Sequence, residues 1–154
     1  KLFLDVKKGE LITIGTTDFL DLPEFGIENL GCKIDTGAET SAIHCHKVHL
    51  VEEDGEEWVE FKLLDQKHPE YKHQWIKKKL FKTREIKNSF GSTEIRFTIK
   101  SKVVLFNRTY SIEFSLADRE KMKFPILIGK RFLKKKFIVD VSQKNISYNL
   151  KNTP

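Results

Sequence analysis

The sequence has 154 residues, a length typical of one domain, and its apolar fraction of 39% argues against a chain that is disordered throughout. No apolar run approaches the ~20 residues of a membrane-spanning helix. Two cysteines, Cys32 and Cys45, are too few for a disulfide framework and favour a reducing compartment. We therefore expect one domain over residues 1–154 and a cytoplasmic location.

The net charge of +6 originates in one segment. Residues 67–87 contain eight Lys or Arg against two Glu, and the rest of the chain is balanced. A basic insertion of this kind would attract an acidic partner or substrate, although a solvated loop or hairpin face is its commoner origin.

The apolar residues recur in short alternating runs, which predict strands along most of the chain. Asp54-Gly55 is a strong hairpin signal, Phe90-Gly91-Ser92 marks a further turn, and residues 129–135 predict one short helix. The strand-like runs are 11–15, 30–35, 41–51, 57–64, 94–100, 103–106, 110–116 and 126–128, with 137–141 and 146–150 closing the chain. This spacing predicts an all-β fold, a small closed β-barrel with one short helix near the C-terminus.

The segment Asp35-Thr36-Gly37-Ala38 is the strongest candidate for chemistry. It follows an apolar strand, and Gly37 opens a turn from which a carboxylate can project into a cleft. Taken alone, such an aspartate more often serves a turn or a helix N-cap. Hydrolysis of a peptide bond by carboxylates requires two of them facing one water and sharing a proton.

The sequence holds no second copy of this motif. The other aspartates, none of which begins an Asp-Thr/Ser-Gly segment, are 5, 18, 21, 54, 65, 118 and 140. If Asp35 works in a pair, its partner is Asp35 of another chain across a two-fold axis. The motif count therefore predicts a homodimer.

Two segments together resemble the signatures of the retropepsins. One is Asp-Thr-Gly-Ala at 35–38, and the other is Ile-Leu-Ile-Gly-Lys-Arg-Phe-Leu at 126–133. The chain is more closely similar to the bacterial retropepsin-like family often labelled "ATP-dependent zinc protease". Its members share Lys-Ile-Asp-Thr-Gly-Ala-x-Thr-Ser-Ala-x-His (33–44), Arg-Glu-Ile (84–86) before Gly91, and Ile128-Gly129. They frequently occur with ATP-grasp glutamate ligases, and the resemblance covers about residues 10–150.

The resemblance implies roles for individual residues. Asp35 would be catalytic, Thr36 would form a hydrogen-bond lock between subunits, and Gly37 and Ala38 would complete the loop that binds substrate backbone. Ile128 and Gly129 would support this loop.

The resemblance also implies a brace for the site and raises the question of a flap. Glu39 and Lys130 occupy positions where retroviral enzymes place a bracing Asp–Arg pair. No glycine-rich flap is visible in the sequence, so a flap is built from residues around 57–90 or is missing.

A metal site is one alternative reading. His44 and His46 share one face of a predicted strand, which would let two imidazoles approach one ion in a metal-dependent protease. A third ligand is not evident, and neither a His-Glu-x-x-His segment nor a phosphate-binding loop for ATP occurs. Surface or hydrogen-bonded histidines are the better interpretation, and we expect no metal and no cofactor.

The basic segment leaves two binding readings open. Trp75 and Phe81 are interleaved with lysines, an arrangement that would suit nucleic acid, although we do not expect nucleic acid as the partner. The same charges would also recognise glutamate-rich peptides, with the contacts made by Lys77, Lys78, Lys79 and Arg84. A non-catalytic retropepsin-like barrel that binds an acidic partner or nucleic acid through this basic segment is the remaining alternative.

Overall fold

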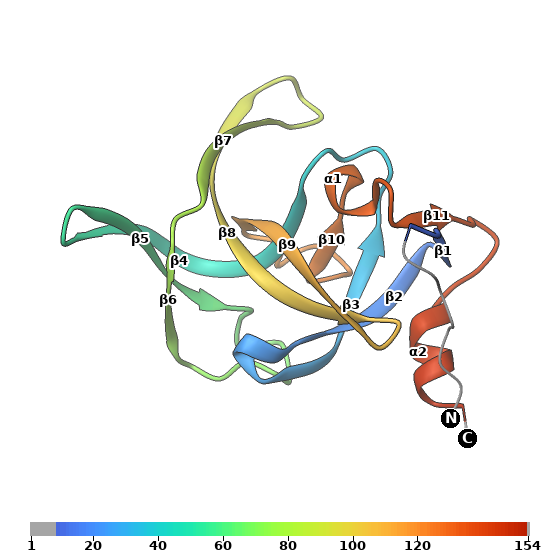
Figure 1. Cartoon of the computed structure of the whole chain (residues 1–154). Helices are drawn as coiled ribbons and strands as arrows, with labels where there is room; N and C mark the ends of the chain where they lie inside the picture. Colours follow the sequence, from blue (N-terminus) through green and yellow to red (C-terminus); the bar gives the residue numbers. More distant parts are fainter. Residues whose placement is uncertain (1–8, 154) are drawn as a thin grey trace.

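The computed structural model describes residues 9–153 and consists mainly of strands (Figure 1). In chain order the strands are β1 (Ile12–Ile14), β2 (Thr17–Leu22), β3 (Ile27–Ile34), β4 (Ser41–Glu53), β5 (Glu56–Leu63), β6 (Trp75–Lys79), β7 (Lys82–Lys87), β8 (Thr93–Leu105), β9 (Arg108–Ala117), β10 (Ile126–Ile128) and β11 (Phe137–Val139). The helices are short: the 3-10 turn η1 (Pro23–Phe25), α1 (Lys130–Leu133) and α2 (Ile146–Lys151). Among these residues no helix is long and apolar enough to cross a bilayer.

Six strands pair in a ring. The order is β10-β3-β2-β8-β9-β4, and β4 pairs with β10 to close it. The short strand β10 runs parallel to β3 and antiparallel to β4, with Ile126 opposite both Cys32 and Ile43. This pairing places the end of β3 beside the end of β10, although the two are far apart in the sequence.

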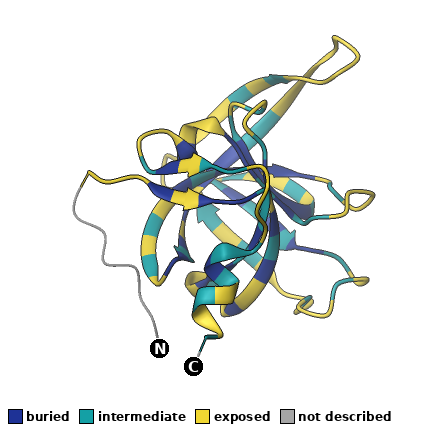
Figure 2. Cartoon of the chain, turned by 90° about the vertical axis from the view of Figure 1, so that its right-hand side faces the viewer, coloured by how far each residue is buried: buried dark blue, intermediate teal, exposed yellow. Residues whose placement is uncertain are grey.

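The inward side chains of the ring form the core. Phe114, Ile43 and Ile126 of the ring are fully buried, and Phe61 of β5 packs into the same core; buried positions are dark blue in Figure 2. Both cysteines lie within this core as free thiols. Burial raises the pKa of the Cys45 thiol to about 12 and raises that of Cys32 as well, so neither is a thiolate near neutral pH.

Two hairpins extend beyond the ring because β4 and β8 are long, with 13 residues each. The β4–β5 hairpin turns at Asp54 and Gly55, which both have positive φ, and this confirms the predicted hairpin. The β7–β8 hairpin projects over one side of the molecule and is mostly exposed (Figures 1 and 2).

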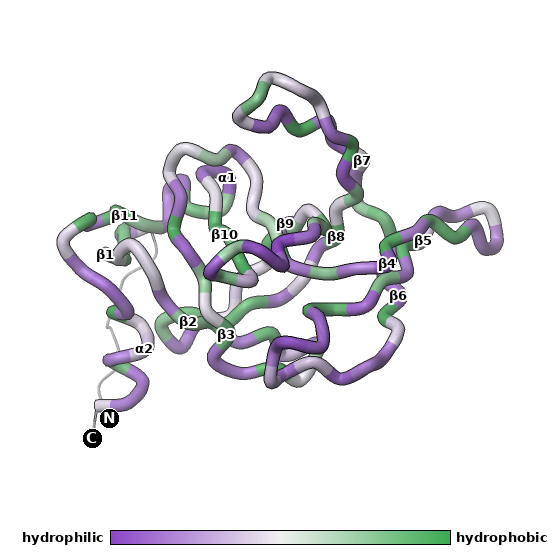
Figure 3. Tube along the Cα trace, turned by 180° about the vertical axis from the view of Figure 1, so that it is seen from behind, coloured by the Kyte–Doolittle hydropathy of each residue, from purple (hydrophilic) through white to green (hydrophobic). Residues whose placement is uncertain are grey.

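The structure differs from the sequence-based expectation in four places. Residues 17–22 form β2, a strand of the ring that no predicted run covers. Residues 146–151 form helix α2 rather than a strand, because the buried Asp18 carboxylate accepts the N–H groups of Ser147 (2.9 Å) and Tyr148 (3.0 Å). The two runs predicted at 94–100 and 103–106 are one strand, β8. The basic segment contributes β6 and β7 to the sheets, and these two strands carry six of its eight Lys or Arg residues. Hydrophilic residues are spread over the β5–β6 connection and both strands (Figure 3).

Candidate active site

Asp35 directly follows β3 and is half-buried. Its backbone N–H donates to the carbonyl oxygen of Ile128 at 2.8 Å, which fixes the start of the loop to β10. The N–H of Gly37 donates to Asp35 Oδ1 at 2.9 Å. The carboxylate is therefore held in place by the backbone of its own loop.

Gly129 permits the loop after β3 to contact the residues after β10. A Cβ atom at this position would lie 2.7 Å from the Thr40 carbonyl oxygen and 2.9 Å from that of Ala38. The Gly129 N–H donates to the buried Ser41 hydroxyl at 3.0 Å, and the Lys130 N–H donates to the Ala38 carbonyl at 2.8 Å. The structure thus brings together the two segments, 35–38 and 128–129, that the sequence singles out.

The expected ion pair between Glu39 and Lys130 is absent from the described part of the chain. Backbone contacts take its place, because the Arg131 N–H donates to the Glu39 carbonyl at 3.1 Å beside the Lys130–Ala38 bond. The Glu39 carboxylate instead contributes to raising the pKa of Arg84, after the larger effect of Glu113. Lys130 begins α1 and is exposed.

A cleft of about 680 Å³ adjoins the Asp35 loop. Gly37 and Ala38 line one part of it, and residues 83–87 of β7 line another. The β7–β8 hairpin therefore borders the cleft; its strand β7 lies within the range 57–90 considered for a flap from the sequence, whereas β8 lies beyond it.

Arg84 anchors this hairpin. Its Nε and Nη2 donate to the two carboxylate oxygens of Glu113 on β9, at 2.5 and 2.9 Å, and both side chains are less than one-fifth exposed. Burial favours the neutral form of Glu113, but the hydrogen bonds from Arg84 prevail and lower its pKa. Arg84 thus has a carboxylate partner within the chain and also lines the cleft, and its contact with an acidic substrate stays a prediction.

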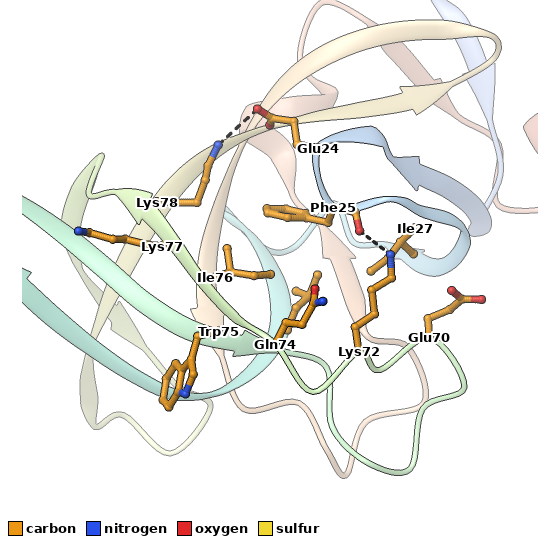
Figure 4. A pocket seen from close by; sticks show the side chains of 11 residues that line it. Glu24, Phe25, Ile27, Glu70, Lys72, Gln74, Trp75, Ile76, Lys77 and Lys78 are labelled. Carbon is orange, nitrogen blue, oxygen red and sulfur yellow. Dashed lines mark hydrogen bonds and ion pairs between the residues drawn. The ribbon is translucent and has the colours of Figure 1, made fainter.

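The three lysines of β6 lie away from this cleft. Each pairs with a glutamate: Lys77 with Glu53, Lys78 with Glu24 (3.4 Å) and Lys79 with Glu56 (3.0 Å). Lys77 and Lys78 line a separate pocket of about 400 Å³ between β6 and η1 (Figure 4). The structure therefore does not bring them to Asp35.

His44 and His46 hydrogen-bond to protein groups. His44 Nε2 lies 2.5 Å from Asp65 Oδ2, and His46 Nδ1 lies 2.7 Å from the Leu64 carbonyl oxygen. Residues 9–153 contain no cluster of three His, Cys, Asp or Glu side chains arranged to hold a metal ion. These contacts fit the hydrogen-bonded interpretation of the two histidines.

The structure adds two residues that sequence reasoning missed. Arg96 on β8 and Arg119 in the loop after β9 both line the cleft. Arg119 is close enough to Asp35 for that carboxylate to oppose the lowering of the Arg119 pKa by burial and by Arg96. No local motif marks either arginine, because they meet only through the pairing of β8 with β9.

Comparison with known proteins gives relatives that are larger than this chain. The chain is 32% identical over 127 residues to a probable alpha-L-glutamate ligase of Desulfotalea psychrophila, and the match covers 82% of the chain and 27% of that protein. A probable alpha-L-glutamate ligase of Shewanella pealeana is 31% identical over 134 residues, which are 84% of the chain and 28% of the relative. The chain thus spans about a quarter of the length of these relatives.

A crystal structure of a Legionella pneumophila protein of unknown function (DUF785) has the same fold. It superposes with a TM-score of 0.72 at 16% identity and covers 90% of this chain and 99% of its own. The family model described as retropepsin-like aspartic endopeptidase RimB matches residues 13–149. With the Asp35 loop, β10 and Gly129 all inside that range, the chain belongs to the RimB-like family of retropepsin-like aspartic endopeptidases.

Proposed function

We propose that the chain is an aspartic endopeptidase that works as a homodimer and cleaves peptide bonds with a water held between two Asp35 carboxylates. The observation that carries this proposal is the Asp35 loop, held by Gly37 and Ile128 beside a cleft that a β-hairpin borders. The ring of paired strands supports a closed retropepsin-like barrel.

The proposed mechanism needs the second subunit because the sequence holds one Asp-Thr-Gly segment. One Asp35 takes a proton from the attacking water while Asp35 of the partner subunit protonates the carbonyl oxygen of the scissile bond. The same pair returns a proton to the leaving amine. No covalent intermediate is formed, and the step requires no group beyond this chain and its copy.

Glutamate-rich or glutamylated proteins are the substrates that we propose. Support comes from the basic lining of the cleft, which includes Arg96, Arg119 and Arg131, and from the relatives whose names describe glutamate ligases. A peptidase that acts on acidic chains would need positive charge near its carboxylates.

Turnover of a peptide library by the wild-type protein and by Asp35→Asn tests the proposal. We expect Asp35→Asn to lower kcat/KM by at least ~100-fold, because general acid–base catalysis by a positioned carboxylate contributes about that much or more. Asp54→Asn is the matched control, since Asp54 precedes a glycine in an exposed turn of the β4–β5 hairpin. Equal turnover by wild type and Asp35→Asn would contradict the proposal.

A further inference from the structure

Two guanidinium groups share the Asp35 cleft although they repel each other. Arg96 and Arg119 both line it, and burial together with the charge of Arg96 lowers the pKa of Arg119. Of residues 9–153, none forms an ion pair with Arg119, and Arg96 pairs only with Glu94, whose side chain is 55% exposed. Like charges held side by side at a cleft are stabilised when an anion lies between them.

The two arginines also keep hydrogen-bond donors available. Arg96 donates from Nη2 to Glu94 at 2.7 Å, but its Nε is buried and has no acceptor within the described residues. Arg119 donates from Nε to the Phe124 carbonyl oxygen at 3.2 Å, which leaves both terminal nitrogens of its fork without a described partner. An acceptor that enters the cleft can take hydrogen bonds from the terminal nitrogens of Arg119, and a charged acceptor strengthens them.

Arg119 is held in place by His44. The backbone N–H of Arg119 donates to the imidazole Nδ1 of His44 at 2.7 Å. The backbone N–H of His44 donates to the Pro125 carbonyl oxygen at 2.8 Å. Both ends of the loop 118–125 are therefore attached to one buried residue. Because Nδ1 accepts, the imidazole proton lies on Nε2, where Asp65 accepts it at 2.5 Å. This loop is preorganised before any ligand arrives.

We infer that Arg96 and Arg119 form a carboxylate-binding subsite that recognises an acidic side chain next to the scissile bond. Arg119 is the specificity-determining residue, and His44 is its positioning residue. The inference rests on the proposed function insofar as a peptide occupies the cleft. A singly charged, planar carboxylate suits the guanidinium fork. A phosphate would bring more negative charge next to Asp35.

Binding to the Asp35→Asn protein tests the subsite without cleavage. Fluorescence anisotropy compares three labelled peptides that differ at one residue, which is Glu, Gln or phosphoserine. We expect the Glu peptide to bind at least about tenfold more tightly than the Gln peptide, because hydrogen bonds from a guanidinium to a charged carboxylate are stronger than those to a neutral amide. Adding Arg119→Gln should bring this ratio near one, whereas Lys77→Gln, which removes an equal charge outside the cleft, should leave it unchanged.

Several results would overturn the subsite. They are an equal loss of preference in Lys77→Gln and Arg119→Gln, a Glu/Gln ratio near one in the starting protein, or tighter binding of the phosphoserine peptide. The proposed function fails separately, when the wild type cleaves none of these peptides. If cleavage fails and the binding pattern holds, the subsite stands in a binding domain. If cleavage occurs with equal kcat/KM for Glu and Gln peptides, the peptidase stands and the subsite fails.

The role of His44 has its own test. His44→Leu removes the acceptor for the Arg119 N–H and should lower the Glu/Gln ratio several-fold. His44→Asn places an amide oxygen where Nδ1 lies and should restore most of that ratio. A purely structural defect would weaken the binding of the Glu and Gln peptides equally and leave the ratio of their affinities unchanged. That outcome would show that His44 does not position Arg119.

Discussion

The contact between the Asp35 loop and the residues after β10 depends on the absence of a side chain at position 129. A Cβ there meets two backbone carbonyl oxygens, of Thr40 and Ala38, at 2.7 and 2.9 Å. Backbone atoms of a hydrogen-bonded loop move less readily than the end of a flexible side chain, so a methyl group would displace the loop that carries Asp35.

We therefore expect Gly129→Ala to lower the free energy of unfolding by about 1–3 kcal/mol, the usual range for overpacking, and to reduce peptide cleavage more than stability alone explains. Urea unfolding and a cleavage assay measure the two effects. Gly31→Ala is the control, because the nearest atoms to a Cβ there belong to side chains, of Phe124 at 3.4 Å and Phe19 at 3.7 Å. Equal and small effects of both substitutions would contradict this account.

Residues of the candidate site differ in how far the sequence predicts them. Asp35 and Gly129 belong to local motifs with a chemical reason for each residue type, and the structure places them together. Arg96 and Arg119 carry no local signal, since an Arg in an alternating run is typical of an exposed strand face and an Arg in a charged loop is typical of solvent exposure. The direct link from His44 to Asp65 also escaped prediction, because those residues meet only through the pairing of β4 with β5.

The β7–β8 hairpin is the element that borders the cleft, and its position depends on one partly buried ion pair. Arg84 reaches across β8 to Glu113 on β9, so the pair ties the hairpin to the ring. Removal of one partner leaves the other charge poorly solvated.

Arg84→Gln is expected to lower the free energy of unfolding by about 1.5–3 kcal/mol, the range for hydrogen bonds to charged groups. A double-mutant cycle with Glu113→Gln should give a coupling of at least about 1 kcal/mol. Lys79 and Glu56 form the control pair, and their exposed ion pair should show no resolvable coupling.

The coupling should also depend on pH in a defined direction. The pKa of Glu113 is lowered from 4.5 because the hydrogen bonds and charge of Arg84 outweigh burial. A carboxylate with a lowered folded-state pKa stabilises the protein above its unfolded pKa, and this stabilisation is lost as pH falls through the folded value. The cycle measured at pH 7 and at about pH 3 should therefore differ, and equal coupling at both would contradict the assignment.

Prediction from sequence was better for most core strands than for peripheral elements, but it missed the ring strand β2, whose inward positions include the buried Asp18 beside Leu20 and Leu22. The apolar runs that became β3, β9 and β10 are buried in the ring, so their pattern reflects their environment. β6 and β7 each lie at a margin of the sheets, where lysine is common. Their lysines leave too few apolar residues for the alternating pattern by which the other strands were predicted. α2 was mistaken for a strand because its capping carboxylate, Asp18, is distant in the sequence.

At the scale of the whole molecule, the proposed catalysis requires a second copy, and the structure offers an apolar surface for it. Loop 35–41, α1 and the β1–β11 pair lie along the same side of the molecule (Figures 1 and 3). Beside them Ile138 and Val141 are 53% and 80% exposed, respectively. Within residues 9–153, β1 and β11 pair with each other alone. Exposed apolar side chains next to an incomplete site are typical of a subunit interface.

Sedimentation of the wild type and of Val141→Asp measures this directly. We expect the wild type to form a dimer whose dissociation constant rises at least about tenfold in Val141→Asp, because a buried unpaired charge opposes association. Leu50→Asp is the control: this residue lies in the β4–β5 hairpin, across the molecule from β11 (Figure 1), and is also partly exposed at 39%. A wild type that stays monomeric at all concentrations would leave Asp35 without its partner. A dimer insensitive to Val141→Asp would keep the paired carboxylates but place the interface away from β11 and Val141. If the interface is there, cleavage by Val141→Asp should fall in proportion to the fraction of the protein that is dimeric.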